Sequence, residues 1–264
     1  MNAHPERAAE SGALDAWVRT AHSGAIVYLT LNRAAKYNVL SAAMIEALRG
    51  TLAAIGSDAG VHVVVLRAEG RAFCAGHDLT EMGAEAGEEE LRALFAACSS
   101  LMLAIRELPQ PVIAQVQGVA TAAGCQLVAM CDLAVASSEA RFAVSGINLG
   151  LFCSTPAVAL SRNLLQKPAL EMLLTGEFIS AETAREYGLV NRVVAPELLD
   201  EEVAKLAATI ASKSPAAIRA GKRLFYQQRE LPIAAAYAQA GEVMAANAVQ
   251  DDARRGIAKF TRRG

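Results

Sequence analysis

The sequence predicts an α/β fold in which a spiral of β-β-α units is followed by a C-terminal helical region. Between residues 26 and 194, short apolar runs typical of strands alternate with longer periodic stretches typical of helices. Two glycine-containing turns, at residues 71–78 and 117–127, each follow an apolar run. From Pro196 onward the composition becomes alanine-rich, which favours helices.

The first part of the spiral is predicted to contain two strands and two helices. Residues 26–31 alternate and are rich in β-forming side chains, and residues 61–66 form a continuous apolar run typical of a buried strand. An acidic loop at 81–90 leads to a helix at 91–108, which two prolines end. Between the strands, Ser41 is a suitable N-cap for an amphipathic helix with apolar positions Met44, Ile45, Leu48, Leu52 and Ile55.

The second part continues the same alternation. A serine, a threonine and a proline at 154–156 form a start signal for a helix. Further helices are predicted at 122–130, 164–175 and 180–187, the last of them stopped by Gly188. Strands are predicted at 112–116, at 133–137, near Phe142 and at 191–194.

The length of 264 residues fits one large domain or a domain with an appended helical piece. We divide the chain into a flexible N-terminal tail at 1–17, a spiral core at 18–195 and a helical region at 196–264. Helices of the last region are expected at 196–213, 215–228, 232–246 and 251–260, and they hold more alanine and leucine than one thin layer would bury.

Composition and charge limit the partners. The apolar share of 53% provides a substantial core, and the net charge of −2 disfavours nucleic acid or an anionic membrane surface as the main partner. No apolar run reaches the roughly 18–20 residues of a membrane-spanning helix. The tail contains Glu6, Glu10 and Asp15 and no apolar core, so it resembles neither a secretory signal nor a transit peptide.

The cysteines predict neither disulfides nor a metal site. They form no CxxC pair, have no histidine at ligand spacing and lie mostly in apolar stretches, which favours buried thiols in a reducing compartment. The five are Cys74, Cys98, Cys125, Cys131 and Cys153.

The two turns carry the strongest indication of chemistry. Residues 71–78, Arg-Ala-Phe-Cys-Ala-Gly-His-Asp, follow the strand at 61–66. Residues 117–127, Gln-Gly-Val-Ala-Thr-Ala-Ala-Gly-Cys-Gln-Leu, follow the strand at 112–116 and open a buried helix. Two such junctions can direct two backbone N–H groups at one point. That arrangement is an oxyanion hole, which stabilises a carbonyl oxygen that gains negative charge during a reaction.

Three motifs resemble those of the enoyl-CoA hydratase/isomerase (crotonase) superfamily. Residues 73–79 resemble its first signature, residues 118–134 its second, and residues 31–41, Leu-Asn-Arg-Ala-Ala-Lys-Tyr-Asn-Val-Leu-Ser, the motif that precedes both. The match runs from about residue 25 to the C-terminus. It implies a crotonase-like spiral, acyl-CoA thioester binding, and a C-terminal region that forms homotrimers, which pair into hexamers. A self-packed helical cap is the alternative for that region.

The resemblance also implies how a thioester is held. Its carbonyl oxygen would lie between the backbone N–H groups of His77 and Ala123, each stabilising an oxyanion by a few kcal/mol. No cofactor is implied beyond the coenzyme A of the substrate. Thr80 weakens one contact to a coenzyme A phosphate. The basic residues near the C-terminus either assist this contact or form an ordinary solvated tail; they are Lys259, Arg262 and Arg263. The residues implied in coenzyme A binding are Arg33, Ala35, Lys36, Tyr37, Val39, Ala75, Asp78 and Leu79.

The acid–base pair of the family's hydratases is missing. Those enzymes use two glutamates, because one group must activate water and another must protonate the α-carbon. The two positions fall here on Gln126 and Gly146, which carry no titratable group. If the pocket geometry is retained, replacing both residues with glutamate is expected to restore activity, and no gain would indicate that the geometry has diverged. Residues 146–156 resemble a mitochondrial branch that also lacks the pair, that of enoyl-CoA hydratase domain-containing protein 3.

Other groups could act in place of the glutamates. Cys153, at a helix start, would be nucleophilic if its pKa were depressed, although a buried small residue is the simpler interpretation. Asp78 is expected to brace its turn, and the His77 side chain is not a base by default. The remaining candidates are Glu81, Glu85, Ser145, Asn148 and Ser154.

Three functions stay open on the sequence. The chain is an atypical acyl-CoA lyase or isomerase, with hydration of crotonyl-CoA at least about a thousandfold below a two-glutamate enzyme. Alternatively it is a non-catalytic acyl-CoA-binding pseudoenzyme, or an acyl-CoA hydrolase that uses Cys153. A bacterial cytoplasmic location is expected in each case.

Overall fold

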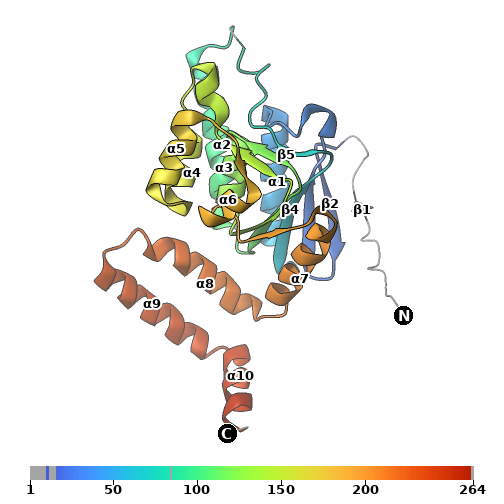
Figure 1. Cartoon of the computed structure of the whole chain (residues 1–264). Helices are drawn as coiled ribbons and strands as arrows, with labels where there is room; N and C mark the ends of the chain where they lie inside the picture. The colour runs from blue at the N-terminus through green and yellow to red at the C-terminus, as the bar shows by residue number, and fades with distance from the viewer. Residues whose placement is uncertain (1–9, 12–15, 84, 263–264) are drawn as a thin grey trace.

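The computed structural model describes residues 10–11, 16–83 and 85–262. Its strands form two sheets beside a layer of helices, and the last three helices extend away from this body (Figure 1). The predicted α/β fold is confirmed. The larger sheet has the order β1-β2-β3-β4-β6-β8-β11, with bounds Glu10–Ser11, Val18–Ser23, Ile26–Leu31, Val63–Ala68, Val112–Val116, Leu133–Ser137 and Arg192–Val194. The smaller sheet has the order β10-β9-β7-β5, with bounds Ile179–Ser180, Arg141–Ala143, Val119–Thr121 and Ala72–Cys74.

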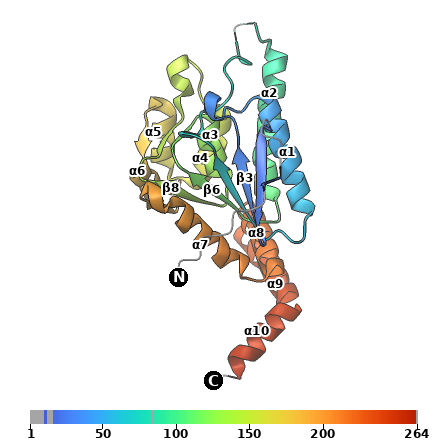
Figure 2. The same ribbon diagram turned by 90° about the vertical axis from the view of Figure 1, so that its right-hand side faces the viewer.

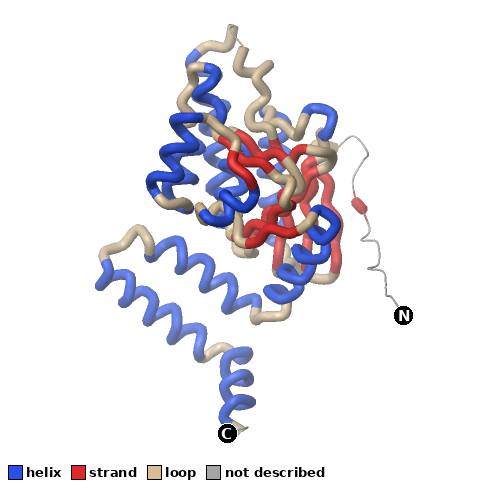
Figure 3. The backbone as a smooth tube through the Cα atoms, viewed as in Figure 1, coloured by secondary structure: helices blue, strands red, loops and turns tan. Residues whose placement is uncertain are grey.

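Each turn of the spiral uses one strand from each sheet and then a helix. Thus β4, β5 and α2 follow one another, as do β6, β7 and α3, and then β8, β9 and α4. Neighbouring strands from β3 to β11 are parallel, as are β5, β7 and β9, which places equivalent ends of successive units side by side (Figure 3). The helices are α1 Ala42–Ser57, α2 Glu88–Glu107, α3 Ala123–Met130, α4 Ser154–Asn163, α5 Gln166–Thr175 and α6 Ala181–Glu186.

Several predicted boundaries need small corrections. The helix α2 begins at Glu88, three residues before the expected start, where Glu90 accepts from the Gly87 backbone N–H at 3.0 Å. The helix α4 has its N-cap at Cys153 instead of Ser154, without a side-chain capping bond. The prediction for α1 is confirmed, since Ser41 Oγ accepts from the Met44 N–H at 3.2 Å.

Of the smaller sheet, the strand predicted near Phe142 is confirmed as β9, whereas β5 and β7 were not predicted. Both β5 and β7 are three residues long, too short to show a period of two in the sequence. They pair with each other and carry the two glycine turns at their ends. The turns therefore belong to a second sheet layer, and they do not follow directly from the long strands β4 and β6 as the sequence suggested.

Different helices pack on the two faces of the larger sheet. One packs on the main core with α1, α2 and α3, and the other is covered by α7, Leu199–Ala211, through Leu199, Val203 and Ala207. The short helices η1, η2 and η3 span Ala34–Lys36, Ser145–Leu149 and Pro196–Leu198. The helices α8, α9 and α10 span Pro215–Gln228, Ile233–Ala248 and Asp251–Thr261 and lead away from the spiral (Figure 2).

The division at residues 17 and 195 stays a prediction. Residues 1–9 and 12–15 of the proposed tail lie outside the described residues, while Glu10–Ser11 pairs with β2. In the described part of the chain, no helix is long and apolar enough to cross a membrane. The same residues contain no cluster of histidine, cysteine or acidic side chains that could hold a metal ion.

Candidate active site

The first glycine turn is held against the second by close backbone packing. Gly76 follows β5 with a φ of +93°, which L side chains rarely adopt. A Cβ at this position would lie 2.9 Å from the Ala122 Cβ and 3.1 Å from the Thr121 carbonyl oxygen. The turn can approach the start of α3 this closely only because residue 76 has no side chain.

The second turn is held in an uncommon backbone conformation. Ala122, the N-cap of α3, has φ +50° and ψ −120°, and its N–H donates to the Ala143 carbonyl oxygen at 2.9 Å. The first turn of α3 touches the end of β5, because a Cβ on Gly124 would lie 2.0 Å from the Cys74 carbonyl oxygen. The β5 strand, the β9 strand and α3 thus fix Ala122 jointly.

These contacts leave two backbone donors without acceptors. Among the described residues, neither the His77 N–H nor the Ala123 N–H donates to a backbone or side-chain oxygen. Ala123 is the first residue of α3, so the positive end of the helix dipole adds to its N–H. The predicted donor pair is therefore brought together at touching turns, which is the arrangement that an oxyanion hole needs.

A cavity of about 290 Å³ opens at these donors. No Asp, Glu, Lys or Arg is among the described residues that line it, and its only titratable side chains are His77 and Cys153. The lining is Ala75, His77, Leu79, Met82, Phe95, Ala122, Ala123, Ser145, Gly146, Leu149, Leu151, Phe152, Cys153, Ser154, Thr155 and Pro156. Larger grooves of about 580 and 910 Å³ lie along α8 beside Arg106 and Tyr226. They are lined by neither glycine turn, so the smaller cavity is the candidate site.

The imidazole of His77 forms part of the cavity wall. Both ring nitrogens are buried without a hydrogen-bond partner, and the ring meets Phe95 edge to face at 5.5 Å between centroids. Burial lowers the pKa of His77, and the Leu40 backbone beside the ring and the Glu81 carboxylate oppose this shift in part. The ring is therefore neutral at neutral pH.

The space beside Gly146, the residue expected to stand at the second glutamate position, is occupied by other atoms. Gly146 lies in η2, and a Cβ there would lie 2.7 Å from the Cys153 Sγ and 2.7 Å from the Leu151 carbonyl oxygen. The thiol thus takes the space into which a side chain at 146 would project. Replacement of Gly146 by glutamate cannot restore a carboxylate without moving this loop.

Cys153 does not have the depressed pKa considered from its position at a helix start. Burial raises the pKa of the thiol, and the facing Gly146 N–H lowers it by less. All five cysteines are buried and free, as expected from the sequence. Ser145, which lines the cavity, has its Oγ 3.0 Å from Thr121 Oγ1.

The other candidate residues take structural positions. Gln126 is buried one turn beyond Ala123, does not line the cavity and leaves its Oε1 without a partner. Asp78 Oδ1 accepts from the Thr80 N–H at 3.0 Å and hydroxyl at 2.7 Å, which braces the turn. Glu81 accepts from the Ala42 N–H at 2.8 Å, so it caps α1.

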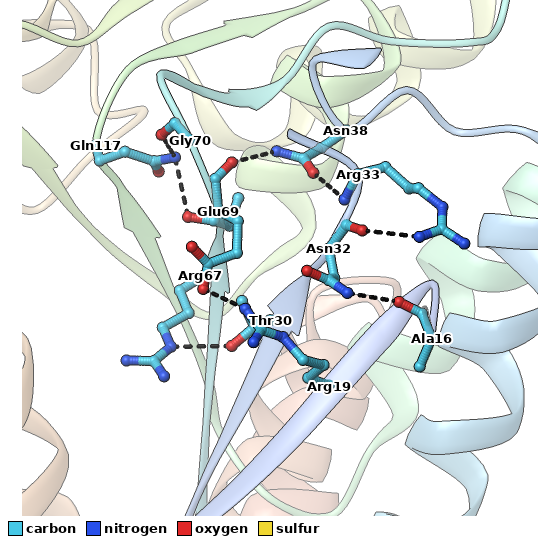
Figure 4. A network of polar contacts seen from close by, with 11 residues as sticks. Ala16, Arg19, Thr30, Asn32, Arg33, Asn38, Arg67, Glu69, Gly70 and Gln117 are labelled. Carbon is cyan, nitrogen blue, oxygen red and sulfur yellow. Dashed lines mark hydrogen bonds and ion pairs between the residues drawn. The ribbon is translucent and has the colours of Figure 1, made fainter. Parts of the chain in front are cut away.

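Asn38 joins the residues 31–41 motif to the first signature. Its buried amide donates to the Glu69 and Ala72 carbonyl oxygens at 2.9 Å, while its Oδ1 accepts from the Arg33 N–H at 2.8 Å (Figure 4). On the same side, the Gln117 amide donates to the Gly70 carbonyl oxygen at 3.0 Å. These bonds hold the loop after β3 beside β5.

The residues expected to bind coenzyme A lie along this loop and the first turn. Ala75 donates its N–H to the Tyr37 carbonyl oxygen at 3.0 Å, and Arg33 stacks over Trp17 at 4.2 Å. Arg71, which was not predicted, hydrogen-bonds the Tyr37 hydroxyl and stacks on its ring. Four of the eight residues expected to bind coenzyme A are exposed: Ala35, Lys36, Tyr37 and Leu79. The other four are partly exposed: Arg33, Val39, Ala75 and Asp78. Their contacts with coenzyme A stay a prediction.

Sequence reasoning missed much of the cavity wall. Phe95 comes from α2, and Met82 and Phe152 come from loops on either side of the site. No local motif marks these residues, because only the packing of α2 beside the first turn brings Phe95 to His77. The positive φ of Ala122 also has no signal in the sequence, because alanine rarely adopts it.

Comparisons with known proteins agree with this geometry. The sequence model of the enoyl-CoA hydratase/isomerase family matches residues 21–264. Enoyl-CoA hydratase domain-containing protein 3, mitochondrial, of Danio rerio is 42% identical over 250 residues, which cover 95% of this chain and 86% of the relative.

Two solved structures extend the comparison. An enoyl-CoA hydratase from Mycobacterium smegmatis is 54% identical with a TM-score of 0.92, covering 94% of this chain and 96% of that one. Human enoyl-CoA hydratase domain-containing protein 3 is 42% identical with a TM-score of 0.91, covering 94% and 98%. The chain therefore belongs to the enoyl-CoA hydratase/isomerase family, in the branch of enoyl-CoA hydratase domain-containing protein 3.

Proposed function

We propose that the protein binds an acyl-CoA thioester with its carbonyl oxygen between the N–H groups of His77 and Ala123. The observation that carries this proposal is the meeting of two unpaired backbone donors at one cavity. Both donors are fixed before a ligand arrives, so they stabilise an enolate without reorganisation. The chemistry supported is formation of a thioester enolate.

The same cavity does not support efficient hydration. Its described lining holds no carboxylate to activate water, and the position of residue 146 is closed by Cys153 and Leu151. General acid–base groups contribute about 10²–10⁴-fold each, so we expect crotonyl-CoA hydration at least about a thousandfold below a two-glutamate enzyme.

The lining also indicates the acyl group. Leu79, Met82, Phe95, Leu149 and Phe152 make the wall apolar, and no described cation faces the cavity to pair with a second carboxylate. An uncharged, apolar acyl group therefore fits, and an acyl group that ends in a carboxylate is excluded by desolvation. The exposed loop around Lys36 and Tyr37 would hold the coenzyme A moiety.

Calorimetric titration with crotonyl-CoA and with free coenzyme A tests the proposal, with the enoyl absorbance followed in the same sample. We expect tighter binding of the thioester than of free coenzyme A, and an enoyl band that persists. A band that disappears at the rate of a normal hydratase would contradict weak hydration. Absence of binding to both ligands would reject acyl-CoA binding itself.

A second candidate is an acyl-CoA-binding protein without turnover. The absence of acidic side chains from the described cavity lining favours it. Thioester hydrolysis by Cys153 stays a third prediction, although burial raises the pKa of that thiol and so weakens its nucleophilicity. Comparison of thioester cleavage by the native protein and by Cys153→Ala tests it.

We further propose that α8, α9 and α10 assemble the protein into trimers, and trimers into hexamers. Large apolar side chains are exposed on and beside these helices, which extend from the spiral (Figure 1). A surface of this kind is unusual on a monomer and typical of an interface. The side chains are Phe225, Leu231, Ile233, Tyr237, Met244, Val249, Ile257 and Phe260. Light scattering coupled to gel filtration should give the mass of three or six chains, and a monomer mass would refute the proposal.

The location of the protein also stays a proposal. The curated relative from Danio rerio is mitochondrial by name, whereas the solved structure from Mycobacterium smegmatis is of a bacterial protein. We retain the bacterial cytoplasm, and fractionation of the source cells would test it.

A further inference from the structure

Two hydroxyl groups of the cavity wall have hydrogen-bonding capacity that the fold does not use. Five side chains of the described lining carry an N–H, O–H or S–H group. Three of them offer little to a ligand. Both ring nitrogens of His77 are buried, Cys153 is only 8% exposed, and the Ser154 hydroxyl donates to a backbone carbonyl oxygen at 3.3 Å. The two that remain are Ser145 and Thr155.

The hydroxyl of Thr155 has no partner in the protein. Thr155 is the second residue of α4, so the carbonyl four residues earlier belongs to the preceding loop, and the hydroxyl makes no hydrogen bond to a described residue. Its oxygen is not one of the buried unpaired atoms, so it stays accessible where this partly exposed residue lines the cavity. Other helical threonines donate to the carbonyl oxygen four residues earlier at 2.7–3.1 Å; they are Thr51, Thr175, Thr209 and Thr261.

The hydroxyl of Ser145 has one partner and capacity for more. Its Oγ lies 3.0 Å from Thr121 Oγ1, and neither hydroxyl makes another hydrogen bond to a described residue. Two hydroxyls hold two protons, and the bond between them uses one. The pair therefore keeps one O–H group that can donate and several lone pairs that can accept. Ser145 is the member of the pair that lines the cavity.

Ser145 is held beside the proposed oxyanion donors. Thr121 and Ala143 are partners in the β7–β9 ladder, and the backbone N–H after Thr121 donates to the Ala143 carbonyl oxygen at 2.9 Å. Ser145 follows Ala143 by two residues, and Ala123 follows Thr121 by two residues. The Ser145 hydroxyl is therefore fixed close to the point where α3 presents the Ala123 N–H.

Thr155 approaches the same wall from α4. A Cβ on Gly146 would lie only 2.7 Å from the Cys153 Sγ, so the residue after Ser145 and the N-cap of α4 are in contact. Thr155 follows Cys153 by two residues. Both unused hydroxyls thus lie next to one contact between η2 and α4, within a lining that is otherwise mostly apolar.

We propose that Ser145 and Thr155 bind a hydroxyl group of the acyl chain near the thioester, so that the ligand is a hydroxyacyl-CoA. This inference rests on the acyl-CoA binding of the proposed function and names the class of acyl group. A ligand hydroxyl both donates and accepts, which matches two hydroxyl side chains. A carboxylate would be desolvated without a described cation to pair with it. The rest of the acyl chain is apolar and meets the apolar part of the lining.

Calorimetric titration with butyryl-CoA, 2-hydroxybutyryl-CoA and 3-hydroxybutyryl-CoA tests this assignment. We expect one hydroxylated thioester to bind about tenfold more tightly than butyryl-CoA, because one net hydrogen bond changes affinity by about that factor. The preferred isomer identifies the carbon that carries the hydroxyl. Binding of both hydroxylated thioesters no tighter than that of butyryl-CoA would overturn the assignment. Failure of all three to bind would instead reject the acyl-CoA binding on which it rests.

Variants of the two residues separate recognition from a structural role. Thr155→Val and Ser145→Ala remove the hydroxyls with little change in shape. Each should lower the affinity for the preferred hydroxybutyryl-CoA about tenfold and leave that for butyryl-CoA unchanged. Thr155→Ser keeps a hydroxyl and should keep the preference, as should Thr209→Val at an exposed site of α7. An equal loss of affinity for both thioesters, or a native preference in both variants, would refute recognition by these hydroxyls.

Discussion

At the scale of single residues, Gly146 and Cys153 act as one unit. A Cβ on Gly146 would lie 2.7 Å from both the Cys153 Sγ and the Leu151 carbonyl oxygen, and the carbonyl is backbone that cannot be moved by a rotamer change. If residue 146 stands at the second glutamate position, as the resemblance implies, the neighbouring loop fills the space that a glutamate side chain would need. Replacement of Gln126 and Gly146 by glutamate should give no gain in crotonyl-CoA hydration, measured by enoyl absorbance, and a clear gain would show that the loop can open.

The strain at Gly146 should also appear as lost stability. We expect Gly146→Ala to lower the free energy of unfolding by about 1–3 kcal/mol, because the added methyl group overlaps two neighbours. Gly50→Ala is the control: it lies within α1 with nothing within 4 Å of its Cβ and should stabilise by about 0.5–1 kcal/mol. Urea denaturation measures both, and equal effects would contradict the packing at 146.

His77 should make the fold acid-sensitive. Its pKa is lowered in the folded state by burial, so the unfolded chain takes up a proton at higher pH than the folded one. Stability is unaffected above the unfolded-state pKa of histidine and is lost as pH falls toward the lower folded-state pKa. Urea denaturation across this window should show a smaller acid loss for His77→Phe than for the native protein. The same acid loss in both would indicate that the buried ring is not the cause.

At the scale of elements, α3 is placed by its contact with β5. Gly124 approaches the Cys74 carbonyl so closely that an alanine Cβ would lie 2.0 Å from the oxygen, which forces the helix away from the strand. Since Ala123 opens the same helix, this shift also moves one of the two proposed oxyanion donors. We expect Gly124→Ala to lower both the melting temperature and the affinity for crotonyl-CoA, whereas Gly221→Ala, with open space around its Cβ in α8, should leave binding unchanged.

At the scale of the whole molecule, a buried ion pair fixes α8 to the spiral. Lys222 donates to Asp132 at 2.7 Å and to the Ile105 and Gln110 carbonyl oxygens at 3.0 Å, and the Tyr226 hydroxyl donates to Asp132 at 2.8 Å. The two charged side chains are 7% and 13% exposed, so each would be costly alone. This cluster joins the spiral to the helix that begins the proposed oligomer surface.

Breaking that pair should destabilise the fold and release α8. We expect Lys222→Met to lower the free energy of unfolding by about 3–5 kcal/mol, because it leaves the Asp132 carboxylate buried without its cation. Lys213→Met, at an exposed position between α7 and α8, should change stability little. Urea denaturation and light scattering on both variants measure the two effects, and equal stability would show that the pair is replaceable.

The sequence by itself determined the order of the main strands and helices and the place of the two turns. The periodicity of β3 and of α1 and the N-cap at Ser41 are local signals, because each depends only on residues within one short segment of the chain. The short strands β5 and β7 were not predictable, because three residues show no period and their pairing partners are distant in the chain.

The tertiary structure alone decided what the cavity contains. His77 and Phe95 come from the unit of β4, β5 and α2, and Cys153 comes from the unit of β8, β9 and α4, so their meeting at one cavity follows only from the tertiary packing. Whether the His77 imidazole is neutral depends on the atoms that surround it in space, and the identity of the residue does not specify those atoms. The sequence determined that residues 126 and 146 are glutamine and glycine, and packing decided that a thiol and a backbone carbonyl fill the space beside Gly146.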